Sequence, residues 1–215
     1  SPRDRVLLAL VLLLALVVRI PSTVGIYPGI AHWDERFILQ NARALGLDGA
    51  LDPPSVYYPA LAHYPHALAL RGLKIASALH ERWYRTPLLA PEGRLLKEQT
   101  ARVCKYVQGV TGVVTTFLVF LVGRRLRSSA SGLWAALFLA VSPFDAFTSQ
   151  LLKPQATMTL FTVAAFLATL RVRERPSLGR VLAAGALVGC SVASNYNGFT
   201  IAAPPAAVVL LANGG

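Results

Sequence analysis

Residues 103–127 have the sequence VCKYVQGVTGVVTTFLVFLVGRRLR, an apolar run that ends in three arginines. A run of about 20 apolar residues is typical of a helix that crosses a membrane. Arginines placed directly after such a run mark the cytoplasmic end of the helix. This stretch therefore predicts an integral membrane protein, and it assigns one end of the helix to the cytoplasm.

The same pattern of apolar runs and arginines recurs along the chain. Arg3 and Arg5 precede the first run, and further arginines at 171–175 follow the fourth. Because the arginine clusters fall at every second end of the runs, the chain is predicted to cross the membrane in alternating directions. Five or six spans are predicted, at about 6–20, 103–122, 130–143, 155–170, 181–194 and 199–212. Residues 21–101 then form one long extracytoplasmic loop.

The composition of the 215 residues agrees with this interpretation. Only 14% of the residues are charged, whereas a soluble domain has about 25%. The net charge of +11 comes from cations that flank the apolar runs, which favours membrane lipids over nucleic acid as partners. Cys104 and Cys190 lie in apolar runs without a partner motif, so neither a disulfide framework nor a metal site is expected.

The long loop contains two helical patterns. Glu35–Leu45 has apolar residues at helical spacing, and Gly46 is expected to end that helix. Pro65 is expected to start a second helix over 66–82, whose mixture of apolar and cationic residues suits a helix lying in the membrane interface. The predicted fold is therefore an all-α polytopic membrane bundle whose first extracytoplasmic loop contains interfacial helices.

Two carboxylates, Asp34 and Glu35, follow the first span. A carboxylate at this position can act as a general base on a hydroxyl group. Asp34 also stands directly before the predicted helix, where aspartate is a favoured N-cap, and the two roles are compatible. Glu35 in the first turn would also interact favourably with the helix dipole. Arg19, at the end of the first span, is expected to snorkel to the interface.

A series of motifs resembles a known family. In chain order the motifs are Trp33-Asp34-Glu35, Tyr57-Tyr58-Pro59, Arg102 at the start of the second span, Gly123-Arg124-Arg125, Ser142-Pro143, Lys153-Pro154 and Asn195-Tyr196-Asn197-Gly198. Their order and spacing resemble the polytopic glycosyltransferases of the C-type fold. The branch of protein O-mannosyltransferases and aminoarabinose transferases is the most similar. Residues 1–215 correspond to the N-terminal part of such an enzyme, and we expect the chain to belong to a longer protein.

The resemblance implies an activity and a set of site residues. Such enzymes move a sugar from a polyprenyl-phosphate donor to an extracytoplasmic hydroxyl acceptor on a protein, lipid or glycan, and inversion is expected. Asp34 would be the catalytic base with Glu35 beside it. The remaining roles it implies are phosphate binding by Arg102 and Lys153, and substrate binding by Tyr57, Tyr58, Asn195 and Tyr196. High Ala, Arg and Leu usage indicates a bacterial or archaeal cell membrane, with the active face extracytoplasmic.

The chain departs from the family pattern at three places. Gln155 stands where an aspartate is frequent, Asn195 stands where a lysine is frequent, and the Tyr/Pro stretch lacks a lysine before its first proline. These departures leave room for a divergent donor or for an inactive relative.

A non-enzymatic transporter or lipid-binding membrane protein is the alternative function. A proton-coupled transporter needs ionisable groups within its spans. The middle regions of the predicted spans are nearly free of them, and Lys105 lies close to an end. The four histidines lack the spacing of a metal site. No cofactor is expected; a divalent metal is compatible with the chemistry, but no residue pattern indicates one.

Overall fold

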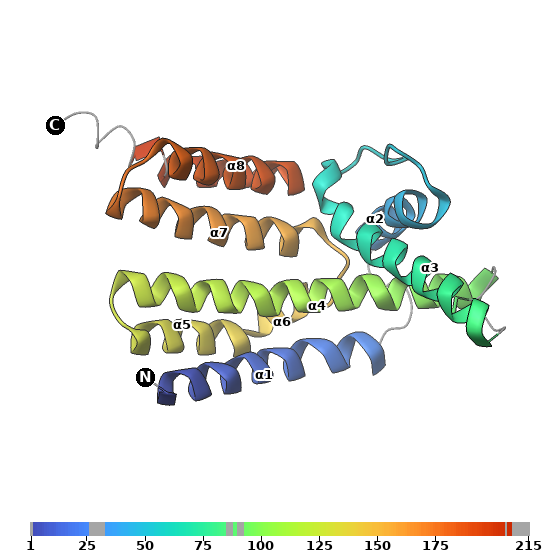
Figure 1. Cartoon of the computed structure of the whole chain (residues 1–215), viewed down its shortest axis with the longest axis horizontal. Helices are drawn as coiled ribbons and strands as arrows, with labels where there is room; N and C mark the ends of the chain where they lie inside the picture. The colour runs from blue at the N-terminus through green and yellow to red at the C-terminus, as the bar shows by residue number, and fades with distance from the viewer. Residues whose placement is uncertain (1, 26–32, 85–87, 90–92, 205, 208–215) are drawn as a thin grey trace.

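The computed structural model describes residues 2–25, 33–84, 88–89, 93–204 and 206–207, and within them it consists of helices joined by turns and bends, without strands (Figure 1). Its elements are, in order, α1 (Pro2–Gly25), α2 (Trp33–Arg43), the π-helical turn η1 (Ala44–Asp48), the 3-10 turn η2 (Ala60–Ala62), α3 (Tyr64–Tyr84), α4 (Gly93–Leu126), α5 (Ser129–Val141), α6 (Pro143–Thr148), α7 (Pro154–Glu174), α8 (Leu178–Ser194) and the 3-10 segment η3 (Tyr196–Ala202).

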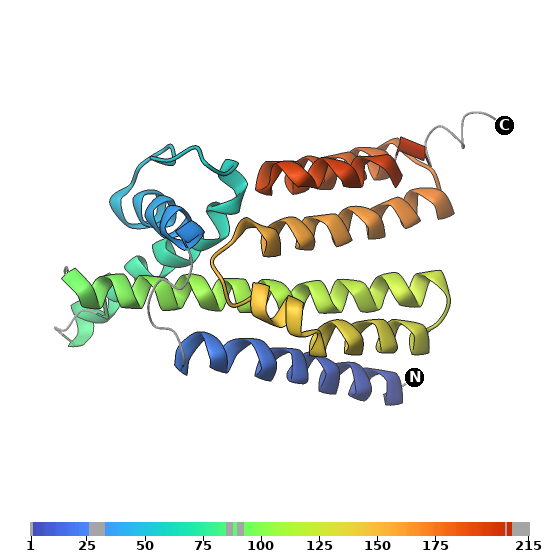
Figure 2. The same cartoon turned by 180° about the vertical axis from the view of Figure 1, so that it is seen from behind.

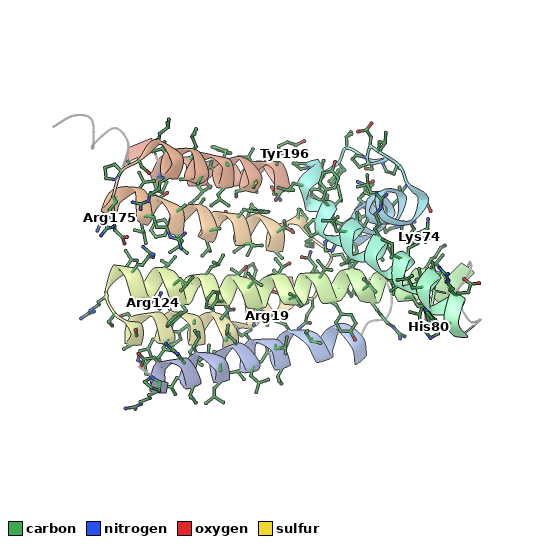
Figure 3. All side chains as sticks on the ribbon, in the orientation of Figure 1. Arg19, Lys74, His80, Arg124, Arg175 and Tyr196 are labelled. Atoms are coloured by element: carbon green, nitrogen blue, oxygen red, sulfur yellow. The ribbon has the colours of Figure 1, made fainter. Side chains whose placement is uncertain are left out.

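Five long helices, α1, α4, α5, α7 and α8, lie side by side in alternating directions (Figures 1 and 2). The start of α1, the α4–α5 turn and the α7–α8 turn lie at one end of this bundle, and α2 and α3 lie at the other. Arg124 and Arg175 are both found at the end that carries the start of α1 (Figure 3). The arginine clusters therefore gather at one end of the bundle, as their alternation in the sequence predicts.

Within the part of the chain that the structure describes, two helices are long and apolar enough to cross a membrane, Leu96–Leu126 within α4 and Pro154–Glu174. The helices α5 and α8 are apolar but shorter. With 34 residues, α4 is about 50 Å long, which exceeds the ~30 Å hydrocarbon core of a bilayer. Its first turns therefore extend beyond the predicted span 103–122, and α3 packs on α4.

Two predicted spans have different boundaries in the structure. The span predicted at 130–143 stops at Val141, because the Ser142 hydroxyl accepts a hydrogen bond from the Asp145 backbone and Pro143 starts α6. The span predicted at 199–212 begins inside η3, a 3-10 segment. Its residues 205 and 208–212 lie outside the described residues.

Gly46 does not end the helix that begins at Trp33, so that prediction was wrong. The chain continues through η1 and stops at Gly49, whose φ of 80° is the left-handed conformation typical of a helix end. Gly46 instead allows close packing, because a Cβ atom there would lie 2.5 Å from the Ala67 carbonyl oxygen on α3.

Arg19 does not snorkel to the interface, which corrects the second local prediction. Its side chain is fully buried between α1 and α4 (Figure 3), and it pairs with the Asp145 carboxylate. The guanidinium also donates to the carbonyl oxygens of Leu139 at 2.9 Å and Ala140 at 3.0 Å. These belong to the last turn of α5, where carbonyl groups lack helical partners. Arg19 therefore ties α1 to the junction of α5 and α6.

Replacing Arg19 by Met should lower the free energy of unfolding by about 3–5 kcal/mol, because the partly buried Asp145 carboxylate and the last carbonyl oxygens of α5 would lose a buried cation as their partner. Arg5→Met, at an exposed position of the same helix, should change it by less than about 0.5 kcal/mol. Denaturant unfolding in detergent measures both variants. Equal losses for the two variants would refute the role of Arg19.

Candidate active site

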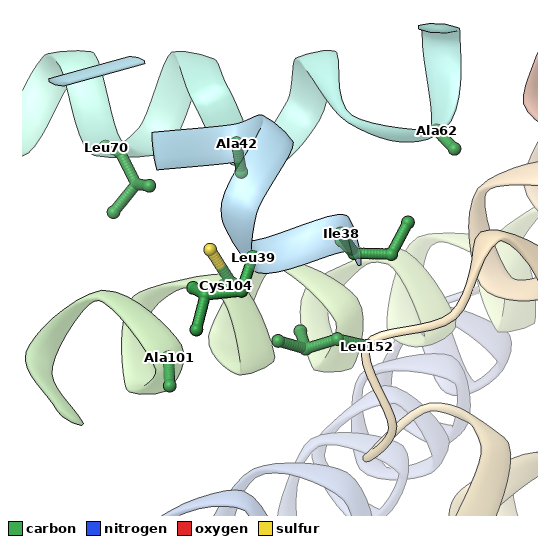
Figure 4. Packing of buried hydrophobic residues seen from close by; sticks show 8 residues of the cluster. All are labelled: Ile38, Leu39, Ala42, Ala62, Leu70, Ala101, Cys104 and Leu152. Atoms are coloured by element: carbon green, nitrogen blue, oxygen red, sulfur yellow. The ribbon is translucent and has the colours of Figure 1, made fainter. Parts of the chain in front are cut away.

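A cluster of buried apolar side chains holds α2 against α4 and against the segment before α7 (Figure 4). Its members are Ile38, Leu39, Ala42, Ala62, Leu70, Ala101, Cys104 and Leu152. Because Ile38 lies one turn after Asp34 on α2, this packing brings the start of α2 to residues 151–154. The two carboxylates of the sequence motif therefore lie at the junction of three segments that are distant in the sequence.

Glu35 is fully buried, and its carboxylate is bound on two sides. Its Oε1 atom accepts a hydrogen bond from the Leu152 backbone N–H at 3.0 Å and lies 3.6 Å from the Lys105 Nζ atom. Lys105 itself is 2% exposed. Burying a carboxylate is costly unless it is paired and hydrogen-bonded, and these partners meet that requirement. Glu35 therefore joins α2 to α4 and to the segment before α7.

Asp34 is more accessible than its neighbour. α2 begins at Trp33, so Asp34 lies in the first turn and not ahead of the helix. Its Oδ2 atom lies 3.9 Å from the Lys153 Nζ atom, and the two side chains are 18% and 20% exposed. The Tyr58 hydroxyl donates a hydrogen bond to Asp34. Burial and this hydrogen bond raise the pKa of Tyr58 above its usual value, so Tyr58 remains a donor.

Gln108 on α4 fixes the backbone that carries Lys153. Its Nε2 atom donates to the carbonyl oxygens of Leu151 at 3.2 Å and of Lys153 at 2.5 Å. The N–H of Leu152, between them, is bound by Glu35. Pro154 then starts α7 at a position where its missing N–H has no cost. The position of Lys153 beside Asp34 is thus set by contacts on both sides of the backbone.

Aromatic rings flank the exposed side of Asp34. The Phe37 and Tyr57 rings stack with centroids 4.9 Å apart, and the Tyr57 and Tyr58 rings meet edge to face at 4.9 Å. Trp33 extends this row, with its centroid 6.0 Å from that of Phe37. Trp33 and Tyr57 are both exposed. The row therefore provides an apolar surface near the carboxylate, and its exposed rings are accessible to a substrate.

Three of the predicted site residues thus meet in the structure, because Asp34 contacts both Lys153 and Tyr58. Arg102 is exposed on α4. Asn195 caps η3 by accepting a hydrogen bond from the Asn197 backbone at 3.1 Å. Tyr196 is exposed at the end of α8 that faces η2 (Figure 3).

The sequence analysis missed Lys105 and Gln108 as members of the site. Both had been assigned to a span, and Lys105 had been regarded only as a cation near its end. They are three residues apart and therefore lie on the same face of α4. Two polar residues on one face of an apolar run were the signal in the sequence.

Two buried histidines lie behind this site. The His63 Nε2 atom is 2.9 Å from the Asn41 side chain, and Asn41 also exchanges two hydrogen bonds with the Ser55 backbone, at 2.8 and 3.0 Å. Burial lowers the pKa of His63 to about 4 and that of His66 to about 3. Within the described residues, no group of three or more His, Cys, Asp or Glu side chains is arranged to hold a metal ion.

A comparison with protein-family models matches residues 93–215 to the dolichyl-phosphate-mannose-protein mannosyltransferase family. The chain belongs to this family. The match confirms the resemblance inferred from the motifs, and it makes the protein an integral membrane glycosyltransferase of the mannosyltransferase kind. The matched region begins at the first residue of α4, so it contains Lys105 and Lys153, whereas Asp34 and Glu35 precede it. No individual curated protein matches the chain.

Acidification should destabilise the region of α2 and α3 between pH 6.5 and about 3. Because the folded state keeps His63 and His66 neutral, the unfolded state binds protons first as the pH falls below 6.5. Stability is then fully present above pH 6.5, and each histidine costs up to about 1.4 kcal/mol per pH unit below it. Thermal unfolding at several pH values should show a weaker pH dependence for His66→Leu than for the wild type. His80→Leu is the control, and an identical pH dependence in all three proteins would contradict the assignment.

Proposed function

We propose that this protein transfers a sugar from a polyprenyl-phosphate donor to an extracytoplasmic hydroxyl group in a single inverting displacement. The observation that carries the proposal is the contact between Asp34 and Lys153, a carboxylate and a cation 3.9 Å apart and both partly accessible. The displacement needs a base on the acceptor side and positive charge on the leaving-group side. One pair of neighbouring side chains supplies both.

Asp34 is the proposed base. An acceptor hydroxyl would donate its proton to the Asp34 carboxylate as its oxygen attacks the anomeric carbon of the sugar. The Tyr58 hydroxyl and the first turn of α2 hold the carboxylate in place. Glu35, which the sequence analysis grouped with Asp34 as catalytic, is buried and bound to Leu152 and Lys105. We therefore assign Glu35 a positioning role.

Lys153 is the proposed partner of the phosphate that leaves. Breaking the bond between sugar and phosphate transfers negative charge to the phosphate, and a cation positioned in advance stabilises that charge. Lys153 would exchange its contact with Asp34 for the phosphate when the donor binds. Arg102, exposed three residues before Lys105 on α4, is the proposed second cation. Tyr57, Asn195 and Tyr196 remain proposed substrate contacts.

An apolar groove supports a lipid-linked donor. A cavity of about 390 Å³ lies between α3, α4 and α7 and runs along α4 from Val103 to Val114. These twelve residues of helix cover about 18 Å. The lining is almost entirely apolar, including Ala69 from α3 and Leu160 from α7. The apolar lining suits a prenyl chain. Arg102 directly precedes Val103, the first residue of α4 that lines the groove.

The proposed placement puts α1, α4, α5, α7 and α8 across the membrane with the arginine end in the cytoplasm. Asp34 is then extracytoplasmic, in a bacterial or archaeal cell membrane. The helix α3 has an exposed apolar row on the side opposite its buried residues, which suits the outer membrane interface. The row consists of Leu68, Ile75, Leu79 and Trp83.

A transporter is the competing function, and one observation bears on it. Two ion pairs with buried cations, Arg19–Asp145 and Lys105–Glu35, are found among the described residues. Arg19 and Lys105 lie at the ends of predicted spans, and both carboxylates lie outside the predicted spans, which agrees with the expected lack of ionisable groups in mid-span. Both pairs also bind backbone groups at the ends of helices or in a connecting segment. That arrangement holds elements together and does not form a continuous path, which favours the enzyme.

In the full-length protein, Asp34→Asn should lower kcat for sugar transfer at least about 100-fold, the usual contribution of a general base. Transfer is measured with a radiolabelled polyprenyl-phosphate mannose donor. Asp48→Asn, an exposed aspartate in the same region, should leave the rate unchanged. Full activity in Asp34→Asn would exclude it as the base.

Glu35→Gln separates the two carboxylates. Glutamine keeps an acceptor for the Leu152 N–H group but removes the charge that pairs with Lys105. We expect about a tenfold loss of kcat/KM with an unchanged pH profile, and a larger loss together with lower thermal stability in Glu35→Leu. If Glu35→Gln lowered kcat as much as Asp34→Asn while remaining folded, Glu35 would be the base instead.

A further inference from the structure

Two aromatic side chains close to Asp34 are exposed and yet held in place. They belong to the aromatic row, which consists of Trp33, Phe37, Tyr57 and Tyr58. The row lies on α2 and on the loop between η1 and η2, at the end of the bundle opposite the arginines (Figure 1). Trp33 is 63% exposed and Tyr57 is 58% exposed. Large apolar rings that gather in one exposed patch mark an interaction surface.

Phe37 lies between the two exposed rings and fixes both. Its ring stacks on that of Tyr57, with 14° between the planes, and meets the Trp33 ring edge to face, with 72° between the planes. Phe37 is followed by Ile38, which is buried in the cluster that holds α2 against α4. The rings of Trp33 and Tyr57 therefore lose little conformational freedom when a ligand binds, which favours affinity.

Polar groups flank the two exposed rings. The exposed Arg36 guanidinium lies 5.3 Å from the centroid of the Trp33 ring and offers several N–H donors. On the other side, the Tyr58 hydroxyl donates to Asp34. A ligand for this surface needs apolar faces for the rings and oxygen atoms at its edges. A pyranose has this distribution, because its C–H groups stack on the negative face of an aromatic ring while its hydroxyls point outward.

The backbone beside the aromatic row is unsuited to pairing with a peptide strand. Residues 52–59, DPPSVYYP, include three prolines, which have no N–H group. The N–H and carbonyl groups of Ser55 are both bound by the Asn41 side chain, at 3.0 and 2.8 Å. A peptide that binds by adding a strand needs free backbone groups along an edge, and this segment has few. Proline-rich peptides also dock on aromatic rings without strand pairing, so the experiment includes them.

We propose that the aromatic row is a subsite for a saccharide, with one sugar ring stacked on Tyr57 and another on Trp33, and that the acceptor hydroxyl belongs to a glycan. The assignment to the acceptor rests on the proposed function, because the row leads to the proposed base, Asp34. Arg36 donates to oxygen atoms of the ring on Trp33. In the transfer step the glycan oxygen bonds to the anomeric carbon, its proton passes to Asp34, and the phosphate leaves with the electron pair.

Binding is measured without the donor, so that this test does not depend on transfer. The full-length protein, fluorescently labelled in detergent, is applied to an array of defined oligosaccharides and to an array of serine- and threonine-containing peptides, including proline-rich ones. Trp33→Ala and Tyr57→Ala should each weaken oligosaccharide binding at least about tenfold, and Trp33→Phe should recover part of the loss. Trp83→Ala, which removes an exposed tryptophan from α3, is the control and should bind as the wild type does. Thermal unfolding verifies that each variant is folded.

Three results would overturn the proposal. The first is binding to peptides that Trp33→Ala abolishes, which would assign the row to a peptide acceptor. The second is oligosaccharide binding unchanged in Trp33→Ala and Tyr57→Ala, or absent in the wild type. The third is strong quenching of Trp33 fluorescence by brominated phospholipids in nanodiscs, because a ring inserted in the bilayer cannot stack on a glycan. Replacing Trp83 and Trp134 by Phe leaves Trp33 as the only tryptophan of residues 1–215 for that measurement.

Transfer from polyprenyl-phosphate mannose to the bound oligosaccharides separates this proposal from the proposed function. Asp34→Asn should retain oligosaccharide binding and lose transfer. Binding that depends on the aromatic row, without transfer to any bound oligosaccharide, would uphold the saccharide subsite and reject the proposed function. Transfer to a peptide without any oligosaccharide binding would uphold the proposed function and reject the saccharide subsite.

Discussion

The buried carboxylate of Glu35 is the constraint on which the site depends. Removed from water, it is stable only with a cation and a hydrogen-bond donor, and these come from Lys105 on α4 and from the Leu152 backbone. Satisfying this one group brings together α2, α4 and the segment before α7. The contact between Asp34 and Lys153 follows, because Asp34 is adjacent in sequence to Glu35, and Lys153 is adjacent to Leu152, which Glu35 binds.

The Arg19–Asp145 pair also joins segments that are distant in the sequence. It too joins an early helix to a later junction, and it too binds backbone groups that would otherwise be buried without partners, the last carbonyls of α5. The two pairs fix the beginning and the end of the segment from α6 to α7. That segment carries Lys153 at the candidate active site. Pairs that cost desolvation energy in a membrane thus position this site.

Local and periodic features of the sequence predicted the helices and their alternating directions. Length and hydrophobicity specify a span without its partners, and prolines such as Pro154 specify helix starts. The sequence did not reveal that Arg19 and Lys105 face inward, because a cation near the end of an apolar run has the same local pattern whether it snorkels or pairs. Its partner lies many residues away and is selected only by packing. Asp34, Lys153 and Tyr58 were predicted as separate residues, but their contacts required the fold.

The position of Asp145 in the structure changes the interpretation of Gln155. In the sequence, Gln155 stands where an aspartate is frequent, which left room for a divergent donor or for an inactive relative. In the structure, both residues line one cavity between α4, the α5–α6 junction and α7. A second carboxylate there would add negative charge to a cavity that already contains the Asp145 carboxylate. An amide at position 155 instead adds an acceptor and leaves the Arg19–Asp145 charge balance intact. The departure from the family pattern is therefore compatible with an active enzyme.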